Sequence, residues 1–181
     1  MNQWRLAVQA TFWTSLTLLL GGCMPDLRSE HPAPRVYWLD AVALADPPAV
    51  NPTVELVPGL DTDRIWLLEP DQRLNYYAGA FWPDRLQAVL QSLLERSVGE
   101  GGGGADVHVL VERYFAVGDP NAGPPDLEIA ARIETQGLHC RFESRRRSES
   151  ERLRDIVAGH QQLFDELVEA IVSTVRSGAC P

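Results

Sequence analysis

Four residues near the start of the sequence, Leu20-Gly21-Gly22-Cys23, have the form of a bacterial lipobox. Signal peptidase requires small side chains just before the cut, and lipidation requires a thiol at the new N-terminus. As a helix, the apolar run over residues 6–20 would cover about 22 Å, short of the roughly 30 Å hydrocarbon core of a bilayer. We therefore predict a lipoprotein signal peptide over residues 1–22 and acylation of Cys23. An ordinary secretory signal, with Cys23 incidental, is the alternative.

The residue after this cysteine is Met24. An Asp at this position usually retains a Gram-negative lipoprotein in the inner membrane, so Met24 favours the outer membrane, with the protein facing the periplasm. Two or more acyl chains would anchor the protein stably to outer-membrane lipids. The prolines predict a stiff tether over residues 23–35, of which residues 24–34 reach roughly 30 Å when extended. Residues 36–181 are then expected to form one domain.

Two further cysteines, Cys140 and Cys180, form an even pair in a compartment that permits disulfides. A bridge between them would contribute roughly 4 kcal/mol in the chain-entropy model. Cys140 is expected on the apolar face of a strand, and a helix lying on that face would end near Cys180. The disulfide is therefore geometrically reasonable, and two free thiols are the alternative.

Other residue types that could do chemistry lack the spacing for it. The glycines over residues 99–104 precede an expected strand and lack the Lys-Ser/Thr of a phosphate loop. No Gly-x-Ser-x-Gly element is present, and the histidines show no metal-ligand spacing. They are His31, His108, His139 and His160, of which the last is expected to be a partly buried core residue. We expect no enzymatic activity, no bound metal and no cofactor. The net charge of -9 argues against nucleic acid as a partner.

Two groups of residues could contact a partner. Arg145-Arg146-Arg147 is the one basic cluster; it could meet lipid headgroups or an acidic partner, or be the exposed end of a strand. The second group is aromatic and could form a docking surface or a core plug where a strand meets a helix. Its members are Tyr76, Tyr77, Phe81 and Trp82.

Hydrophobic periodicity divides residues 36–181 into strands and two amphipathic helices. Strands are expected over residues 36–39, 54–57, 64–69, 73–77, 105–117, 127–135 and 138–143. Residues 41–53, with three prolines, are expected to be a long loop. One helix is expected over residues 83–98, and a second from a capping box at Ser148 and Glu151 to a stop at Gly178. This order predicts an α+β domain: a mixed, largely antiparallel sheet with both helices packed on it.

Taken together, these features resemble the ABC-type transport auxiliary lipoproteins, which include the paraquat-inducible protein C group. The resemblance covers nearly all of the chain after the signal peptide, and its most specific part is the entrance to the first helix. The residues that carry it are the lipobox at Cys23, Tyr37-Trp38-Leu39, Asp63-Arg64-Ile65, the aromatic segment 76–82 and Trp82-Pro83-Asp84-Arg85-Leu86.

The resemblance implies a non-catalytic role. Members of this family accompany transporters built from a permease, an ATPase and an MCE (lipid-binding) protein that move lipids between the inner and outer membranes. It implies an MCE-domain protein as partner, and some members assemble as homo-oligomers. An envelope assembly lipoprotein, for outer-membrane proteins or lipopolysaccharide, is the alternative.

Overall fold

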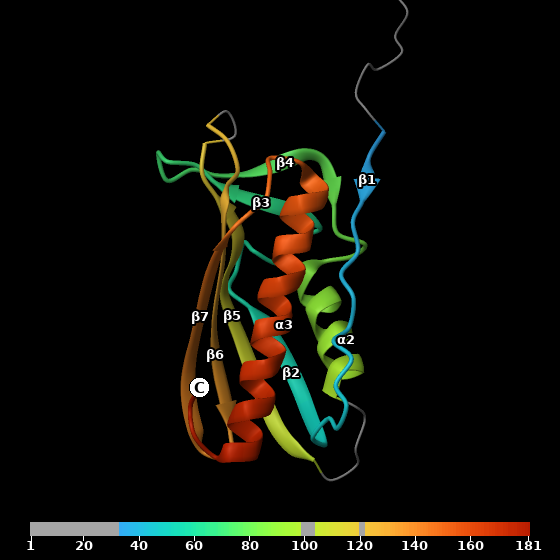
Figure 1. Ribbon diagram of the computed structural model, residues 1–181, viewed down its shortest axis with the longest axis vertical. Helices are drawn as coiled ribbons and strands as arrows, with labels where there is room; N and C mark the ends of the chain where they lie inside the picture. Colours follow the sequence, from blue (N-terminus) through green and yellow to red (C-terminus); the bar gives the residue numbers. More distant parts are fainter. Residues whose placement is uncertain (1–32, 99–103, 120–121) are drawn as a thin grey trace, which may run out of the picture. The chain divides into compact units, whose positions relative to one another are not determined.

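A computed structural model of the protein describes residues 33–98, 104–119 and 122–181 (Figure 1). The predicted signal peptide, Cys23 and most of the tether lie outside the described residues. Those described form one sheet and two helices. Their order is β1 (Arg35–Val36), β2 (Val50–Leu56), β3 (Arg64–Leu68), β4 (Leu74–Phe81), α2 (Leu86–Val98), β5 (Ala105–Val117), β6 (Asp126–Thr135), β7 (Leu138–Arg147) and α3 (Leu153–Ser177).

The seven strands form one sheet in the order β1-β4-β3-β5-β6-β7, with β2 paired to β5. The hairpins β3–β4, β5–β6 and β6–β7 are antiparallel, whereas β1 on β4, β2 on β5 and β3 on β5 are parallel. The prediction of a mixed, largely antiparallel α+β domain is confirmed. Gln136 and Gly137, both at positive φ, form the predicted tight turn between β6 and β7.

Side-chain alternation gives this sheet two different faces. On β6, Leu127, Ile129 and Ile133 are fully buried, while Arg132 and Glu134 are exposed. Both helices cover the apolar face, with α3 against β5, β6 and β7 and α2 against β2 (Figure 1). We call the opposite face the open face, because no described helix lies on it.

The helix α3 packs closely on the sheet at Gly159. A Cβ at this position would overlap the side chain of Leu127, which is fully buried. Any other residue here would force the buried side chain of Leu127 to move, so glycine favours this close approach. At the C-terminal end of α3, Gly178 adopts a left-handed φ of 64°, and its N–H donates to the carbonyl of Thr174. The predicted stop is confirmed.

Residues 41–53 are not entirely a loop, because β2 begins at Val50 and pairs with β5 from Ala105 onward. A strand was predicted over residues 54–57, and the prolines concealed its first part. Pro52 is tolerated because β2 is paired on one edge only. On its other side, Gln91 of α2 accepts the N–H of Val54 (2.6 Å) and donates to the carbonyl of Pro52 (2.8 Å). A helix side chain therefore satisfies this strand edge.

Several predicted boundaries were wrong. The strands β4 and β7 continue to Phe81 and Arg147, beyond the predicted ends at residues 77 and 143. The first strand comprises only Arg35–Val36. The helix α2 begins at Leu86 and not at Pro83, and the N–H of Leu86 donates to the carbonyl of Thr62. The capping box at Ser148 and Glu151 does not form: α3 begins at Leu153 after Arg152, which makes no side-chain cap.

Candidate functional site

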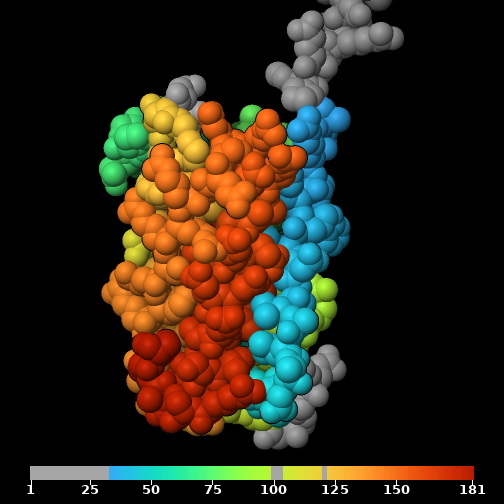
Figure 2. All heavy atoms as spheres, viewed as in Figure 1, coloured from blue at the N-terminus to red at the C-terminus, as the bar shows by residue number. Residues whose placement is uncertain are grey.

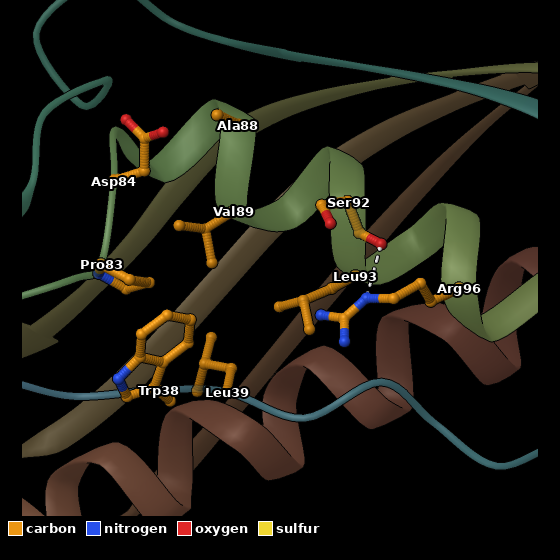
Figure 3. A pocket seen from close by; sticks show the side chains of 9 residues that line it. All are labelled: Trp38, Leu39, Pro83, Asp84, Ala88, Val89, Ser92, Leu93 and Arg96. Atoms are coloured by element: carbon orange, nitrogen blue, oxygen red, sulfur yellow. Dashed lines mark hydrogen bonds between the residues drawn. The ribbon is translucent and has the colours of Figure 1, made fainter.

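A groove lies between α2 and the segment that follows β1 (Figure 3). It encloses about 260 Å³ and is mostly apolar. Its walls come from the chain just after β1, from the start of α2 and from one side of that helix. The nine lining residues are Trp38, Leu39, Pro83, Asp84, Ala88, Val89, Ser92, Leu93 and Arg96.

The segment after β1 is held in place by both helices. Gln161 of α3 accepts the N–H of Asp40 (2.6 Å) and donates to its carbonyl (2.9 Å). The hydroxyl of Ser97 on α2 accepts the N–H of Val42 (2.8 Å). Farther along, Arg176 contacts Asp46, and Figure 2 shows this blue-to-cyan part of the chain lying beside α3. The groove wall therefore has a defined position.

Trp38 and Leu39 show how this segment divides its side chains. Leu39 is only 4% exposed and belongs to the core, whereas Trp38 is 72% exposed, the largest value among the exposed apolar side chains of the described residues. An indole in water is costly unless something covers it. Trp38 is thus an accessible apolar wall at the mouth of the groove.

The polar atoms of the groove lie at its rim. Figure 3 shows Asp84 at one end of α2 and Arg96 at the other. Arg96 donates from Nε to the carbonyl of Ser92 (3.2 Å), and Asp84 accepts the N–H of Arg85 (2.7 Å). With its polar atoms at the rim and a mostly apolar lining, the groove is suited to binding an apolar group.

The four aromatic residues singled out in the sequence do not form one surface. Trp82 is 3% exposed and packs in the core, whereas Tyr76 is 45% exposed. Tyr77 lines a small cavity on the helix side with Ile156, where burial raises its pKa to about 12. Phe81 is half-buried beneath the guanidinium of Arg64. The docking and core-plug interpretations therefore apply to different members of the group.

Trp82 is part of an aromatic cluster beneath α3. The ring of His160 lies 4.8 Å from that of Tyr114 and 5.8 Å from that of Trp82. Tyr114 donates its hydroxyl to the backbone carbonyl of His160 (3.0 Å). Neither ring nitrogen of His160 has a partner, and burial lowers its pKa to about 3. His160 is thus a neutral core residue, buried completely and not partly as predicted.

Each arginine of the basic cluster is paired with a carboxylate. Arg145 lies 2.7 Å from Asp126 and 3.2 Å from Glu128, and the contact with Asp126 raises the pKa of Arg145. Arg147 lies 3.9 Å from Asp126, and Arg146 turns toward α3 and Glu166 at 3.5 Å. Their charge is therefore largely compensated within the domain.

Cys140 of β7 and Cys180 are joined by a disulfide, with 5.3 Å between their Cα atoms. It connects the chain after α3 to the far edge strand of the sheet. The described residues contain no group of three or more His, Cys, Asp or Glu that could hold a metal ion. None of the described helices is both long and apolar enough to span a membrane.

Comparison with known proteins identifies the fold. No family model and no curated protein matches the chain. Among solved structures, that of a protein from Xanthomonas campestris described as DUF330 has a TM-score of 0.63, with 16% identity over 80% of this chain and 96% of that one. The structure of an uncharacterized protein has a TM-score of 0.61, with 13% identity over 80% and 99%. These TM-scores show a shared fold, and at such low identities they show the fold alone.

The sequence interpretation did not identify the groove. Trp38 was predicted in a strand, and Ala88 and Ser92 were not singled out. One signal was available: Ala88 and Ser92 are small residues four positions apart, on a helix face that a neighbouring segment can approach. The segment's position depends on Gln161, a contact 121 residues away in sequence that no local pattern reveals.

Proposed function

We propose that this protein is an outer-membrane lipoprotein that acts as a non-catalytic auxiliary subunit of an MCE-type ABC transport system, which moves lipids between the inner and outer membranes. Acylated Cys23 anchors it in outer-membrane lipids, and the domain binds an MCE-domain protein. The resemblance in sequence supports this role.

The observation that carries the proposal is the groove beside Trp38. It is apolar and open, and it lacks a catalytic set among its lining residues. One wall of the groove follows the tether directly in sequence. The length of residues 23–34 therefore limits how far the groove can lie from the anchor. A binding subunit held at a membrane needs such an accessible surface.

The test is cross-linking in intact cells, followed by identification of what the lipidated protein captures. We expect an MCE-domain protein to be recovered, and Ala88→Asp to abolish its recovery by placing a charge in the groove. Ala158→Asp is the matched control, because Ala158 is an exposed alanine of α3 that does not line the groove. Equal capture by both variants would place the contact elsewhere.

Two outcomes would overturn the proposal itself. One is that no MCE-domain protein is recovered from cells that produce one. The other is specific capture of an outer-membrane-protein or lipopolysaccharide assembly factor instead, which would favour the alternative function of an envelope assembly lipoprotein.

A further inference from the structure

The exposed large apolar side chains of the described residues gather at one end of the domain. The four largest exposures are Val36 at 52%, Trp38 at 72%, Leu74 at 41% and Tyr76 at 45%. All four lie in or directly after β1 and in β4, which form one edge of the sheet. The apolar exposure is therefore concentrated where the chain arrives from the tether.

On the open face, Val36, Leu74 and Tyr76 belong to one continuous surface. Trp38 is separate from it and lines the groove beside α2. Strand register places Trp66 opposite Tyr76, Leu68 opposite Leu74 and Phe81 between Arg64 and Val36. The rings of Trp66 and Tyr76 meet edge to face at 6.2 Å. We call this surface the aromatic patch; it comprises Val36, Arg64, Trp66, Leu74, Tyr76 and Phe81.

A bulge assembles the patch. Tyr76 and Phe81 are five residues apart, so regular alternation would put them on opposite faces. The register of β3 and β4 shifts between Arg64 and Trp66, and Gly79 adopts a φ of 71°. As a result both rings lie beneath one guanidinium, with Arg64 at 4.9 Å from Tyr76 and 4.2 Å from Phe81.

The other half of the open face has the opposite character. There Arg113 lies between Glu128 (3.3 Å) and Glu143 (3.2 Å), and Arg132 pairs with Glu112. These strands, β5 to β7, expose side chains whose charges are matched within the domain. The open face thus has a polar, ion-paired half and an apolar half.

We infer that the aromatic patch contacts the lipid surface in which the protein is anchored, an inference that rests on the proposed acylation of Cys23. Val36 follows Cys23 by 13 residues (36 − 23), so an extended tether places it within about 45 Å of the membrane. Trp and Tyr rings with an Arg above them are the side chains that settle at the level of lipid headgroups.

Charge favours a lipid surface over an acidic or basic protein. The patch contains no carboxylate, and its one charge, on Arg64, has Asp63 at 3.5 Å. The chain as a whole has a net charge of -9, so anionic lipids repel the protein overall. A surface without carboxylates therefore meets a membrane at a low electrostatic cost.

The experiment uses tryptophan fluorescence of the lipidated protein in vesicles of phosphatidylethanolamine and phosphatidylglycerol with brominated acyl chains. Once residues 1–22 are removed, the tryptophans are Trp38, Trp66 and Trp82. In Trp38→Phe, emission comes from Trp66 in the patch and from buried Trp82. Trp38→Phe/Trp66→Phe supplies the Trp82 baseline. We expect bromine to quench Trp66 and to leave the baseline unchanged.

A second pair of variants tests the patch. In the Trp38→Phe chain, Val36→Ser/Tyr76→Ser should abolish the quenching of Trp66. The control variant Glu55→Ser/His108→Ser should leave the quenching of Trp66 intact. Glu55 and His108 form an exposed pair of side chains, 3.4 Å apart, on the neighbouring strands β2 and β5. Circular dichroism verifies that each variant is folded.

The outcomes separate the two proposals. Mass spectrometry that finds Cys23 without acyl chains contradicts the proposed function. A fully acylated, vesicle-bound protein whose Trp66 is not quenched, or is quenched equally in both double variants, overturns the role of the patch. So does sedimentation showing that the patch joins copies of the chain, with Val36→Ser/Tyr76→Ser dispersing them.

Discussion

His160 is a fully buried titratable side chain without a hydrogen-bond partner. It lies between the rings of Trp82 and Tyr114. Burial alone lowers its pKa to about 3, so it stays neutral in the folded protein. An unfolded histidine titrates near 6.5. The unfolded state therefore binds a proton that the folded state does not, and folding becomes less favourable as pH falls from 6.5 toward 3.

We predict that His160→Leu flattens this acid dependence. Between pH 7 and pH 4.5, His160 should cost the wild-type protein about 2–3 kcal/mol of unfolding free energy, from 1.36 kcal/mol per unit below 6.5. The variant lacks this loss. Urea unfolding at a series of pH values measures the difference.

His139→Leu is the control for this prediction, because its side chain is 75% exposed and lies beside Glu134. It should retain the acid dependence of the wild-type protein. If His160→Leu and His139→Leu show the same slope, the buried imidazole is not its source.

At the element scale, two glutamines perform the same task. Gln91 of α2 bonds the N–H of Val54 and the carbonyl of Pro52, and Gln161 of α3 bonds both backbone groups of Asp40. In each case the amide side chain takes the place of a neighbouring strand's backbone. Its N–H donates to a carbonyl of the segment, and its oxygen accepts a backbone N–H. The helices thereby hold extended segments that have no strand partner on that side.

We predict that Gln91→Ala destabilises the protein by roughly 1–3 kcal/mol, because it leaves a part-buried N–H and carbonyl without partners. Urea unfolding measures the change. Gln87→Ala, on the same helix, is the matched control and should cost less than about 0.5 kcal/mol. Equal losses in the two variants would mean that the bonds to β2 contribute nothing.

For one residue of α3, tight packing predicts a change in stability opposite to the one that helix propensity predicts. Alanine in place of glycine ordinarily stabilises a helix by about 1 kcal/mol. Gly159→Ala should instead destabilise the protein by about 1–3 kcal/mol, because the new methyl meets buried Leu127.

A double-mutant cycle measured by urea unfolding tests this explanation. When Leu127→Ala has made space, Gly159→Ala should become neutral or stabilising. If Gly159→Ala costs the same in both backgrounds, the contact with Leu127 is not responsible.

Most strands and both helices could be predicted because each has one apolar side, which alternation or a helical stripe makes visible in sequence. The first part of β2 was missed because Pro52 disguises it, so that the strand was predicted only from residue 54 onward; its pairing with β5 is non-local. The aromatic patch was only partly visible for a similar reason. Sequence alternation separates Tyr76 from Phe81, and only the bulge near Gly79 reunites them.

At the scale of the whole molecule, the disulfide connects the end of the chain to the edge strand β7. The bridged residues are 40 apart in sequence. Cys180→Ser should therefore cost up to about 4 kcal/mol in the chain-entropy model. Urea unfolding with and without reductant tests this: reductant should lower the stability of the wild-type protein to that of the variant and leave the variant unchanged. An unaffected wild-type protein would contradict the role of the bridge.

The anchor gives the last prediction. Cys23→Ala should release a folded domain from the outer-membrane fraction, because the acyl chains would be the stable attachment. Fractionation of cell envelopes followed by immunoblotting measures it, with Cys180→Ser as a cysteine control that should remain in the membrane. A Cys23→Ala protein that still fractionates with the outer membrane and retains its full function in lipid transport would refute acylation as the anchor.

The short first strand also determines how the domain would respond to tension. A pull between an anchored Cys23 and a bound partner would enter the domain at β1, which is held to β4 by the pairs Arg35–Ala80 and Val36–Phe81 and by the bond from Tyr37 to Phe81. Such a strand peels away one bond at a time. The next restraints, buried Leu39 and the Gln161 bonds to Asp40, would bear the load next. Under tension, the residues of β1 would thus detach and add a few residues to the length of the tether before the load reached the core.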